Sequence, residues 1–339
     1  MAERVLVTGA SGFIATHCIL ALLNAGYGVR GTVRDLNRAA ALKAMLAKHN
    51  PAATDMEFVA AELTADAGWA QAAQGCSYVL HVASPVAINS PRDPDAFVAA
   101  ARDGTLRVLR AAKAAGVKRV VVTSSIAAVG SGKLQPRDRP LTEDDWTNPD
   151  GAGVEAYARS KTLAERAVWE FAKSPEGQGL EIAAVNPGLV LGPALEADYG
   201  SSNELVYQIM KNKIPGYPRT GFSLVDVRDV AGLQLLAMTK PAAAGERFIC
   251  VSEFLWMNEV GAALLAAYPK RKLPKAVLPN WVVYIVAIFN PAARSILDSL
   301  GQRRDLSNAK AVSKLGWQPR GARESAVDAA KSLVDLGIV

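Results

Sequence analysis

The sequence predicts an α/β fold, with a doubly wound parallel sheet and a smaller, mainly helical C-terminal unit. Short β-branched stretches alternate with helical ones over the first 190 residues, which is typical of a parallel sheet covered on both faces. Half of the residues are apolar but only 6 % are aromatic, which suits alanine-rich helices packed closely on a sheet. After Pro187 the pattern changes to loops rich in Gly, Pro and Tyr.

The first part of the chain is expected to hold six strands, all short and β-branched. They are Val5–Thr8, Val29–Val33, Glu57–Ala60, Tyr78–Val82, Arg119–Thr123 and Glu181–Asn186. The helices expected between them are Phe13–Asn24, Ala39–Lys48, Trp69–Ala73, Asp95–Ala115 and Val154–Ala172. Further strands are expected at Ser223–Val227 and Arg247–Val251. We therefore expect a first domain over residues 1–188, which segment 223–250 rejoins or borders, and a second domain over 189–339.

Charge and composition narrow the class of protein. Lys and Arg exceed Asp and Glu by 38 to 32, and this surplus is compatible with nucleic acid, a membrane or an anionic small molecule. Three widely spaced cysteines indicate a reducing compartment. No export signal is evident, and the longest apolar run, Trp281–Phe289, is far shorter than the roughly 20 residues that span a bilayer. These features predict a cytoplasmic protein without a membrane span.

The strongest local motif follows the first strand, where Gly9-x-x-Gly12-x-x-Ala15 leads into a helix. Gly9 permits a tight turn, Gly12 lets a pyrophosphate approach the backbone, and Ala15 lets the helix pack closely on the sheet. The helix N-terminus offers free N–H groups to the phosphates. An ordinary strand–helix turn is the alternative, but the surrounding strands and helix favour a dinucleotide-binding Rossmann domain.

The end of the second strand indicates which dinucleotide binds. An acidic residue at this place holds a free ribose 2′-hydroxyl, whereas an arginine accommodates a 2′-phosphate. Arg34 comes first, with Arg38 one helical turn further, so NADP(H) is favoured. Asp35 is the counter-argument, although it can instead cap the helix that follows.

A catalytic set is suggested by Tyr157-x-x-x-Lys161, inside a predicted helix. These two side chains share one helix face, and a lysine ammonium near a phenol stabilises the phenolate. A strand ending in Ser124 and Ser125 reaches the same sheet edge as the glycine loop. A hydroxyl there can polarise a substrate oxygen, and Ser125 is the stronger candidate. The alternative, mainly for Ser124, is a helix cap.

With these motifs in this order, and with Asn186-Pro187-Gly188 after them, the chain resembles the extended short-chain dehydrogenases/reductases. More narrowly it resembles their dihydroflavonol reductase-like group, which includes bacterial and yeast aldehyde and ketone reductases. Weaker support comes from Gly31–Asp35, His81–Pro85, Thr142–Trp146, Val225–Ala231 and Leu315–Trp317. The resemblance covers essentially the whole chain.

The resemblance implies a Ser-Tyr-Lys mechanism. Tyr157 would protonate the carbonyl oxygen, Lys161 would assist it and bind the nicotinamide ribose, and Ser125 would orient the carbonyl. The implied cofactor contacts are Gly9, Ser11, Gly12, Phe13 and Ile14 at the diphosphate, Glu62 and Leu63 at the adenine, Val82, Ala83 and Ser84 along the cofactor, and Pro187, Gly188 and Val190 at the nicotinamide.

Three positions depart from the pattern of the plant enzymes in this group. Ala41 aligns with a lysine that helps to bind the 2′-phosphate, and Glu62 replaces an aspartate. Gly130 aligns with the asparagine that reads the flavonoid ring. The departures favour a hydrophobic carbonyl substrate other than a dihydroflavonol.

The sequence therefore predicts an NADPH-dependent carbonyl reductase that acts on an aldehyde or ketone. The alternatives are a hydroxysteroid dehydrogenase or nucleotide-sugar epimerase of the same fold and, more remotely, a non-catalytic NADP(H)-sensing module. No metal is expected, because His17, His49 and His81 are scattered. The chain lacks base-reading motifs, so no nucleic-acid partner is expected, and either a monomer or a homodimer would fit.

Two C-terminal features stay outside this interpretation. Between Lys270 and Arg323 there are eleven Lys and Arg against two Asp, interpreted as a solvated surface. Trp281–Phe289 could be core, a cleft wall, a dimer face or a membrane-surface contact, and core or cleft is favoured. Substrate specificity is expected to reside in Val86–Arg92, Ile126–Leu134, Leu189–Arg219 and parts of Leu255–Ser299.

Overall fold

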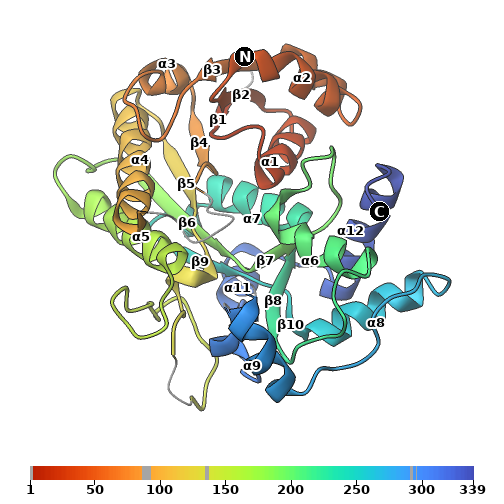
Figure 1. Cartoon of the computed structure of the whole chain (residues 1–339). Helices are drawn as coiled ribbons and strands as arrows, with labels where there is room; N and C mark the ends of the chain where they lie inside the picture. Colours follow the sequence, from red (N-terminus) through yellow and green to blue (C-terminus); the bar gives the residue numbers. More distant parts are fainter. Residues whose placement is uncertain (1–2, 86–92, 134–136, 291–292, 295) are drawn as a thin grey trace.

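The computed structural model describes residues 3–85, 93–133, 137–290, 293–294 and 296–339. Within these residues the chain forms a seven-stranded parallel sheet and a three-stranded sheet, with helices around both (Figure 1). The predicted α/β fold class, a doubly wound parallel sheet with a smaller C-terminal unit, is confirmed. The predicted specificity segment Val86–Arg92 lies outside the described residues, as does Leu134.

The large sheet has the strand order β3-β2-β1-β4-β5-β6-β9. Its strands are β1 (Arg4–Val7), β2 (Gly28–Val33), β3 (Glu57–Ala60), β4 (Tyr78–His81), β5 (Arg119–Thr123), β6 (Glu181–Pro187) and β9 (Arg247–Cys250). The order reverses at β1, since β1 pairs with β2 on one side and with β4 on the other. Ligands of open α/β sheets bind beyond the carboxyl ends of the strands at such a switch point.

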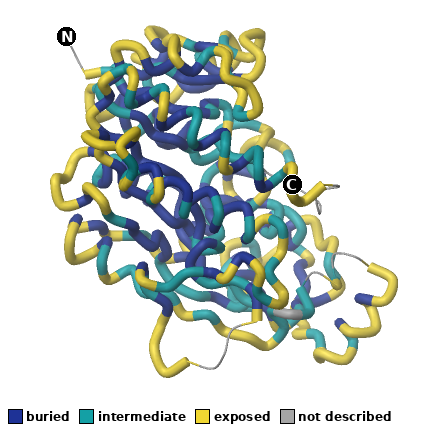
Figure 2. Tube along the Cα trace, turned by 90° about the vertical axis from the view of Figure 1, so that its left-hand side faces the viewer, coloured by how far each residue is buried: buried dark blue, intermediate teal, exposed yellow. Residues whose placement is uncertain are grey.

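Two helical layers cover the sheet, and alternate strand residues face each of them. One layer comprises α1 (Phe13–Asn24), α2 (Ala39–Ala47), α7 (Val227–Thr239) and α11 (Ala309–Leu315); the other comprises α3 (Trp69–Ala73), α4 (Pro94–Ala114) and α5 (Ala156–Lys173). Val5 and Val7 pack in the first core and Leu6 in the second. Buried residues thus run through the centre of the molecule (Figure 2).

A smaller unit follows, built around the sheet order β10-β8-β7. Its strands are β7 (Leu189–Leu191), β8 (Gly221–Asp226) and β10 (Glu253–Trp256), and its helices are α6 (Gly200–Met210), α8 (Met257–Ala267), α9 (Asn280–Phe289) and α12 (Ala322–Asp335). The 3-10 turns of the chain are η1 (Leu36–Arg38), η2 (Pro51–Asp55), η3 (Ile126–Ala128), η4 (Pro241–Ala243) and η5 (Leu297–Ser299). A separate core joins α6, α8 and α12 to this sheet.

The chain passes back from the small unit to the large sheet between β8 and β9. β8 belongs to the small sheet, α7 packs on the large one, and β9 pairs with β6, with Val185 opposite Phe248. The assignment of segment 223–250 to the first domain or to its border stays a prediction. The proposed domain boundary at residue 188 falls between β6 and β7.

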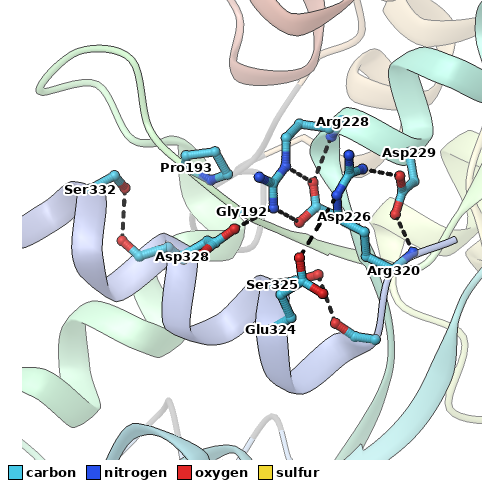
Figure 3. A network of polar contacts seen from close by, with 12 residues as sticks. Gly192, Pro193, Asp226, Arg228, Asp229, Arg320, Glu324, Ser325, Asp328 and Ser332 are labelled. Atoms are coloured by element: carbon cyan, nitrogen blue, oxygen red, sulfur yellow. Dashed lines mark hydrogen bonds and ion pairs between the residues drawn. The ribbon is translucent and has the colours of Figure 1, made fainter. Parts of the chain in front are cut away.

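An ion-pair network fixes α12 across the start of α7 (Figure 3). Asp226 is fully buried and caps α7 through the Arg228 N–H at 2.8 Å. The Arg228 guanidinium bonds Asp226 at 2.7 Å and Asp328 of α12 at 2.5 Å. Nearby, Asp229 accepts the Arg320 N–H at 2.6 Å, and its carbonyl accepts the Trp317 indole N–H. The network thus connects the two units. It includes residues of Val225–Ala231 and Leu315–Trp317, two of the stretches that support the family resemblance.

Three expectations need correction. The strands β7 and β10 are too short, and too close to other elements, to show an alternating pattern, and both went unpredicted. The run Trp281–Phe289 is not core, because it forms most of α9 and only Val283 and Ala287 of that helix are buried, while a place in the wall of the substrate cleft stays a prediction. The helix cap at the end of β5 is Ser125, which caps η3, and not Ser124.

Candidate active site

The glycine loop between β1 and α1 forms an open cradle. Gly9 has φ of 65°, and a Cβ there would lie 3.1 Å from the Cα of Ala83. Gly12 is the N-cap of α1, has an extended backbone, and supplies no side chain to the helix. The N–H groups of the first turn therefore stay open to an outside acceptor. These features fit a dinucleotide diphosphate. Ser11, Phe13 and Ile14 are partly exposed beside the loop.

The β4 end is fastened to this loop by Thr8. Its hydroxyl accepts the N–H groups of Val82 and Ala83, both at 3.0 Å. These two predicted cofactor residues are therefore held by their backbones, and their side chains are half-buried, as is that of Ser84. The loop and the β4 end thus form one rigid edge of the site.

His81 is neutral and structural. Because the Thr8 hydroxyl already accepts two N–H groups, its proton goes to His81 Nδ1 at 2.9 Å. The Nε2–H of His81 then faces Thr105 Oγ1 at 3.3 Å. Burial, with a further effect of the Lys161 charge, lowers the pKa of His81 to about 3. The residues that the structure describes hold no group of ligands suited to a metal ion.

At the end of β2 the two arginines differ. Arg34 is exposed, and its guanidinium bonds no described residue, whereas Arg38 lies 3.9 Å from Glu196. The Asp35 carboxylate accepts the Asn37 N–H at 2.9 Å and so caps η1, as the alternative reading of this residue expected. Arg34 is thus the cation available to an outside anion.

The proposed adenine side is formed by Glu62 and Leu63, after β3. Glu62 has an exposed side chain, and its carbonyl accepts the Trp69 indole N–H at 3.1 Å. Leu63 packs on α4 so closely that a Cβ at Gly104 would lie 2.7 Å from the Leu63 Cβ. Leu63 is therefore fixed, while Glu62 faces solvent.

The proposed catalytic side chains lie on α5 and at the end of β5. Tyr157 is 39 % exposed and Lys161 is buried, with its Nζ 6.0 Å from the Tyr157 ring centre. Lys161 Nζ donates to the Thr123 carbonyl at 3.3 Å, which draws the start of α5 to the end of β5. Ser125 is buried, and its Oγ accepts the Ala127 N–H at 3.1 Å. A solvent-reachable phenol thus stands beside a buried ammonium group.

A fully buried carboxylate, missed by the sequence analysis, supports this arrangement. Glu165 lies one turn beyond Lys161 and pairs with Arg247 of β9 at 2.6 Å. Its carboxylate also accepts Ser124 Oγ at 2.5 Å and Asn186 Nδ2 at 2.7 Å. Asn186 in turn donates to the Ser125 carbonyl. The signal available in the sequence was the interval of four residues from Tyr157 to Lys161 to Glu165.

The proposed nicotinamide side follows β6. Gly188 is needed there, because a Cβ would lie 2.1 Å from the Ser223 carbonyl oxygen of β8. Pro187 is buried in the strand, and Val190 is 4 % exposed and packs in the core. A cofactor contact of Val190 would therefore have to come chiefly from its backbone.

Gly130 is also confined by its surroundings. A Cβ at this position would lie 2.4 Å from Leu141 Cδ1, and the Gly130 carbonyl accepts a hydrogen bond from Arg304. An asparagine at this place would therefore require Leu141 to move, which agrees with the departure from the plant pattern.

The doubly wound sheet, the glycine cradle at its switch point and the Tyr157–Lys161 pair together define a class: an oxidoreductase that uses a nicotinamide dinucleotide. Residues 5–250 match the family described as NAD dependent epimerase/dehydratase, and the chain belongs to this family of extended short-chain dehydrogenases/reductases.

Its relatives are reductases. A cinnamoyl-CoA reductase of Medicago truncatula is 36 % identical over 276 residues, covering 80 % of this chain and 82 % of that protein. Dihydroflavonol 4-reductase of Zea mays is 32 % identical over 280 residues, which cover 80 % of this chain and 76 % of that protein. The yeast methylglyoxal/isovaleraldehyde reductase, solved with NADPH, matches with a TM-score of 0.82 and 28 % identity over 99 % of this chain and 100 % of that one. The predicted family, its dihydroflavonol reductase-like group and the class of enzyme are confirmed.

Proposed function

We propose that the chain is an NADPH-dependent reductase of a hydrophobic aldehyde or ketone, with reversible alcohol oxidation. The observation that carries this proposal is the exposed Tyr157 phenol beside buried Lys161, at the same sheet edge as the glycine cradle. The NADPH-bound yeast reductase supports the choice of cofactor, and so does the Arg34 guanidinium, which is exposed and bonds none of the residues that the structure describes.

The chain's own groups divide the work. The Gly9–Gly12 loop and the α1 N-terminus would hold the diphosphate, Arg34 the 2′-phosphate, and Lys161 the nicotinamide ribose. Bound NADPH would supply the hydride that reduces the carbonyl carbon. Ser125 would hold the carbonyl oxygen, and Tyr157 would deliver a proton to it, so that aldehyde or ketone, hydride and proton give the alcohol. The positive charge of Lys161 would stand beside Tyr157 during this transfer.

The proposed substrate class is based on Gly130 and on partly exposed apolar residues of the small unit. Gly130 provides no side chain that could read a flavonoid ring, and Leu141 occupies the space such a side chain would need. Apolar and aromatic residues of the small unit, such as Tyr199, Phe222 and Trp256, are partly exposed. A hydrophobic carbonyl compound other than a dihydroflavonol therefore fits best.

The test is a panel of aldehydes and ketones, assayed with NADPH and with NADH by the loss of absorbance of the reduced cofactor. We expect oxidation of NADPH with hydrophobic carbonyl substrates. Tyr157→Phe should lower kcat by at least about 100-fold while leaving the Kd for NADPH near that of the wild type. Absence of turnover across the panel, with the two proteins indistinguishable, would contradict the proposal. Tightly retained NAD together with sugar epimerisation would favour the epimerase alternative.

The molecular setting is proposed with the activity. No helix in the described part of the chain is long and apolar enough to cross a membrane. Cys18, Cys76 and Cys250 are free and buried, which supports a cytoplasmic location. We expect a monomer or homodimer without a nucleic-acid partner, because the cofactor itself accounts for an anionic ligand. Light scattering of the purified protein, with and without added DNA, tests both points.

A further inference from the structure

Helix α9 lies at the edge of the molecule (Figure 1), and most of its large apolar side chains are exposed to solvent. The large apolar side chains exposed on this helix are Trp281, Tyr284, Ile285, Val286, Ile288 and Phe289. Phe289 is 84 % exposed, Trp281 65 % and Ile288 64 %, although they are among the largest apolar side chains of the chain. Within this helix only Val283 and Ala287 are buried. An apolar patch this concentrated marks an interaction surface.

The chain that leads into and out of α9 is basic. Between Glu259 and Asp298 the sequence has no acidic residue but five basic ones: Lys270, Arg271, Lys272, Lys275 and Arg294. Lys270, Lys272 and Lys275 are exposed, and their ammonium groups pair with no residue that the structure describes. These three lysines differ in this respect from Lys310 and Lys314, which both pair with Glu246.

A further cation is held at the C-terminal end of the helix. Arg294 donates from Nε to the Ala287 carbonyl at 3.2 Å and from Nη2 to the Ile288 carbonyl at 3.1 Å. It thereby caps α9 and remains exposed close to Phe289. The apolar face therefore has basic groups in the chain on both sides of it.

The apolar face of α9 and the basic residues before and after it together favour one kind of binding partner. A second copy of the chain would bring the same basic residues to the interface, Arg294 at the end of α9 among them, and juxtaposed like charges oppose association. An anionic lipid surface offers an apolar layer and negative headgroups at once. Trp and Tyr prefer the depth of the headgroups, and cationic groups near an anionic leaflet add to binding. A helix of this length cannot span a bilayer but can lie in its surface.

We propose that α9 binds flat on an anionic membrane surface. The Trp281–Phe289 face enters the boundary between headgroups and acyl chains, while Lys270, Lys272 and Lys275 meet the lipid phosphates. The body of the enzyme stays in water. None of these residues belongs to the proposed catalytic or cofactor set, although they lie within Leu255–Ser299, parts of which are expected to contribute to substrate specificity.

Vesicle co-sedimentation tests the proposal on the full chain. The probes are vesicles of phosphatidylcholine alone and vesicles that also contain about 30 mol % of the anionic lipid phosphatidylglycerol. We expect the anionic vesicles to bind the chain at least about tenfold more tightly, with binding falling as salt rises. Lys270→Gln/Lys272→Gln/Lys275→Gln should remove this preference. Trp281→Ser/Ile288→Ser/Phe289→Ser should abolish binding to both.

Controls separate the patch from general stickiness and misfolding. Leu36→Ser and Val312→Ser remove exposed apolar side chains elsewhere and should bind as the wild type does. Brominated lipids should quench tryptophan fluorescence in the wild type but much less in Trp281→Phe. All variants should keep the wild-type melting temperature, because the changed side chains are exposed. Equal binding to both vesicle types, unchanged binding of the α9 variant, or a dimer that this variant converts to a monomer would overturn the proposal.

Discussion

At the scale of single residues, Arg34 should set the choice between the two nicotinamide cofactors. Its guanidinium is exposed and bonds no described residue. Removing it therefore costs the fold little but leaves a 2′-phosphate without its cation. We expect Arg34→Ala to raise the KM for NADPH by roughly 10-fold or more, with little change for NADH. Steady-state kinetics with both cofactors measures this difference.

The matched control is Lys48→Ala, which removes an exposed positive charge at the end of α2. It should leave both KM values unchanged. Arg38→Ala should have a smaller effect than Arg34→Ala, because Arg38 already has Glu196 as a partner. Equal loss of affinity for NADPH and NADH in Arg34→Ala would show that the residue does not read the 2′-phosphate.

Two buried histidines should make the fold sensitive to mild acid. Burial lowers the pKa of His17 from 6.5 to about 4 and, with the Lys161 charge, that of His81 to about 3. Below pH 6.5 the unfolded chain binds protons that the native chain does not. The free energy of unfolding should therefore fall as pH drops from 6.5 to 4, by up to about 1.4 kcal/mol per pH unit for each histidine.

His17→Gln tests this dependence in urea unfolding at several pH values. A glutamine can still donate to the Pro193 carbonyl, which accepts His17 Nε2 at 2.9 Å. In the variant, unfolding should take up about one proton fewer between pH 6.5 and 4, so the free energy of unfolding should depend less steeply on pH. The exposed His49 supplies the control, since His49→Gln should keep the wild-type slope. A slope unaffected by His17→Gln would refute the assignment.

At the scale of elements, α5 links the reacting groups to the core. Along one face its side chains pass from 39 % exposed Tyr157, through buried Lys161, to fully buried Glu165. Glu165 in turn binds Arg247 of β9, whose guanidinium lies 3.5 Å from the Trp146 ring centre. The helix that carries the proposed acid is thus fixed to the last strand of the sheet.

Breaking this buried pair should be costly. Glu165→Leu leaves Arg247 buried without its carboxylate, and we expect a loss of about 3–5 kcal/mol in the free energy of unfolding. Glu165→Leu/Arg247→Leu should regain part of this loss, because it removes both charges. A double-mutant cycle consists of the wild type, Glu165→Leu, Arg247→Leu and the double variant. Urea unfolding of these four proteins measures the coupling free energy between the two side chains.

An exposed pair provides the comparison. Arg110 and Glu176 are both about half exposed, so Glu176→Leu should cost less than about 1 kcal/mol. If Glu165→Leu were no more harmful than Glu176→Leu, the buried pair would have no special part in holding α5 to β9.

At the scale of the whole molecule, the Asp226–Arg228–Asp328 network joins the two units. Burial alone would raise the pKa of Asp226, but the hydrogen bonds and charge of Arg228 hold it below its usual value. The stabilising effect is therefore present above about pH 4 and is lost as the carboxylate is protonated. Arg228→Met should destabilise the chain by about 3–5 kcal/mol near pH 8.

The pH dependence distinguishes this explanation from a loss of packing. Without the guanidinium, burial should raise the pKa of Asp226, so the variant should accept a proton as the pH falls. The difference between wild type and Arg228→Met should then be smaller at pH 5 than at pH 8 in urea unfolding. A difference that stays constant with pH would indicate lost packing alone.

The elements with strong local signals were predictable from the sequence. Phe13–Asn24 and Trp69–Ala73 form helices with the predicted bounds, because their apolar spacing and flanking turns are local properties. The pairing of Glu165 with Arg247 was not predictable, since it joins residues 82 positions apart. The exposure of α9 was not predictable either. An apolar run indicates that a helix can be buried, but it does not indicate whether another element covers it.

The late arrival of β9 has a consequence for synthesis on the ribosome. When residues 1–188 have emerged, β6 has an open edge and Glu165 has no cation, because Arg247 follows about sixty residues later. The first part of the small unit, β7, α6 and β8, must pass through the exit tunnel before the large sheet can close. A chain terminated near Gly188 would therefore expose a β-edge beside a buried carboxylate, and such a fragment should aggregate rather than persist as a free cofactor-binding module.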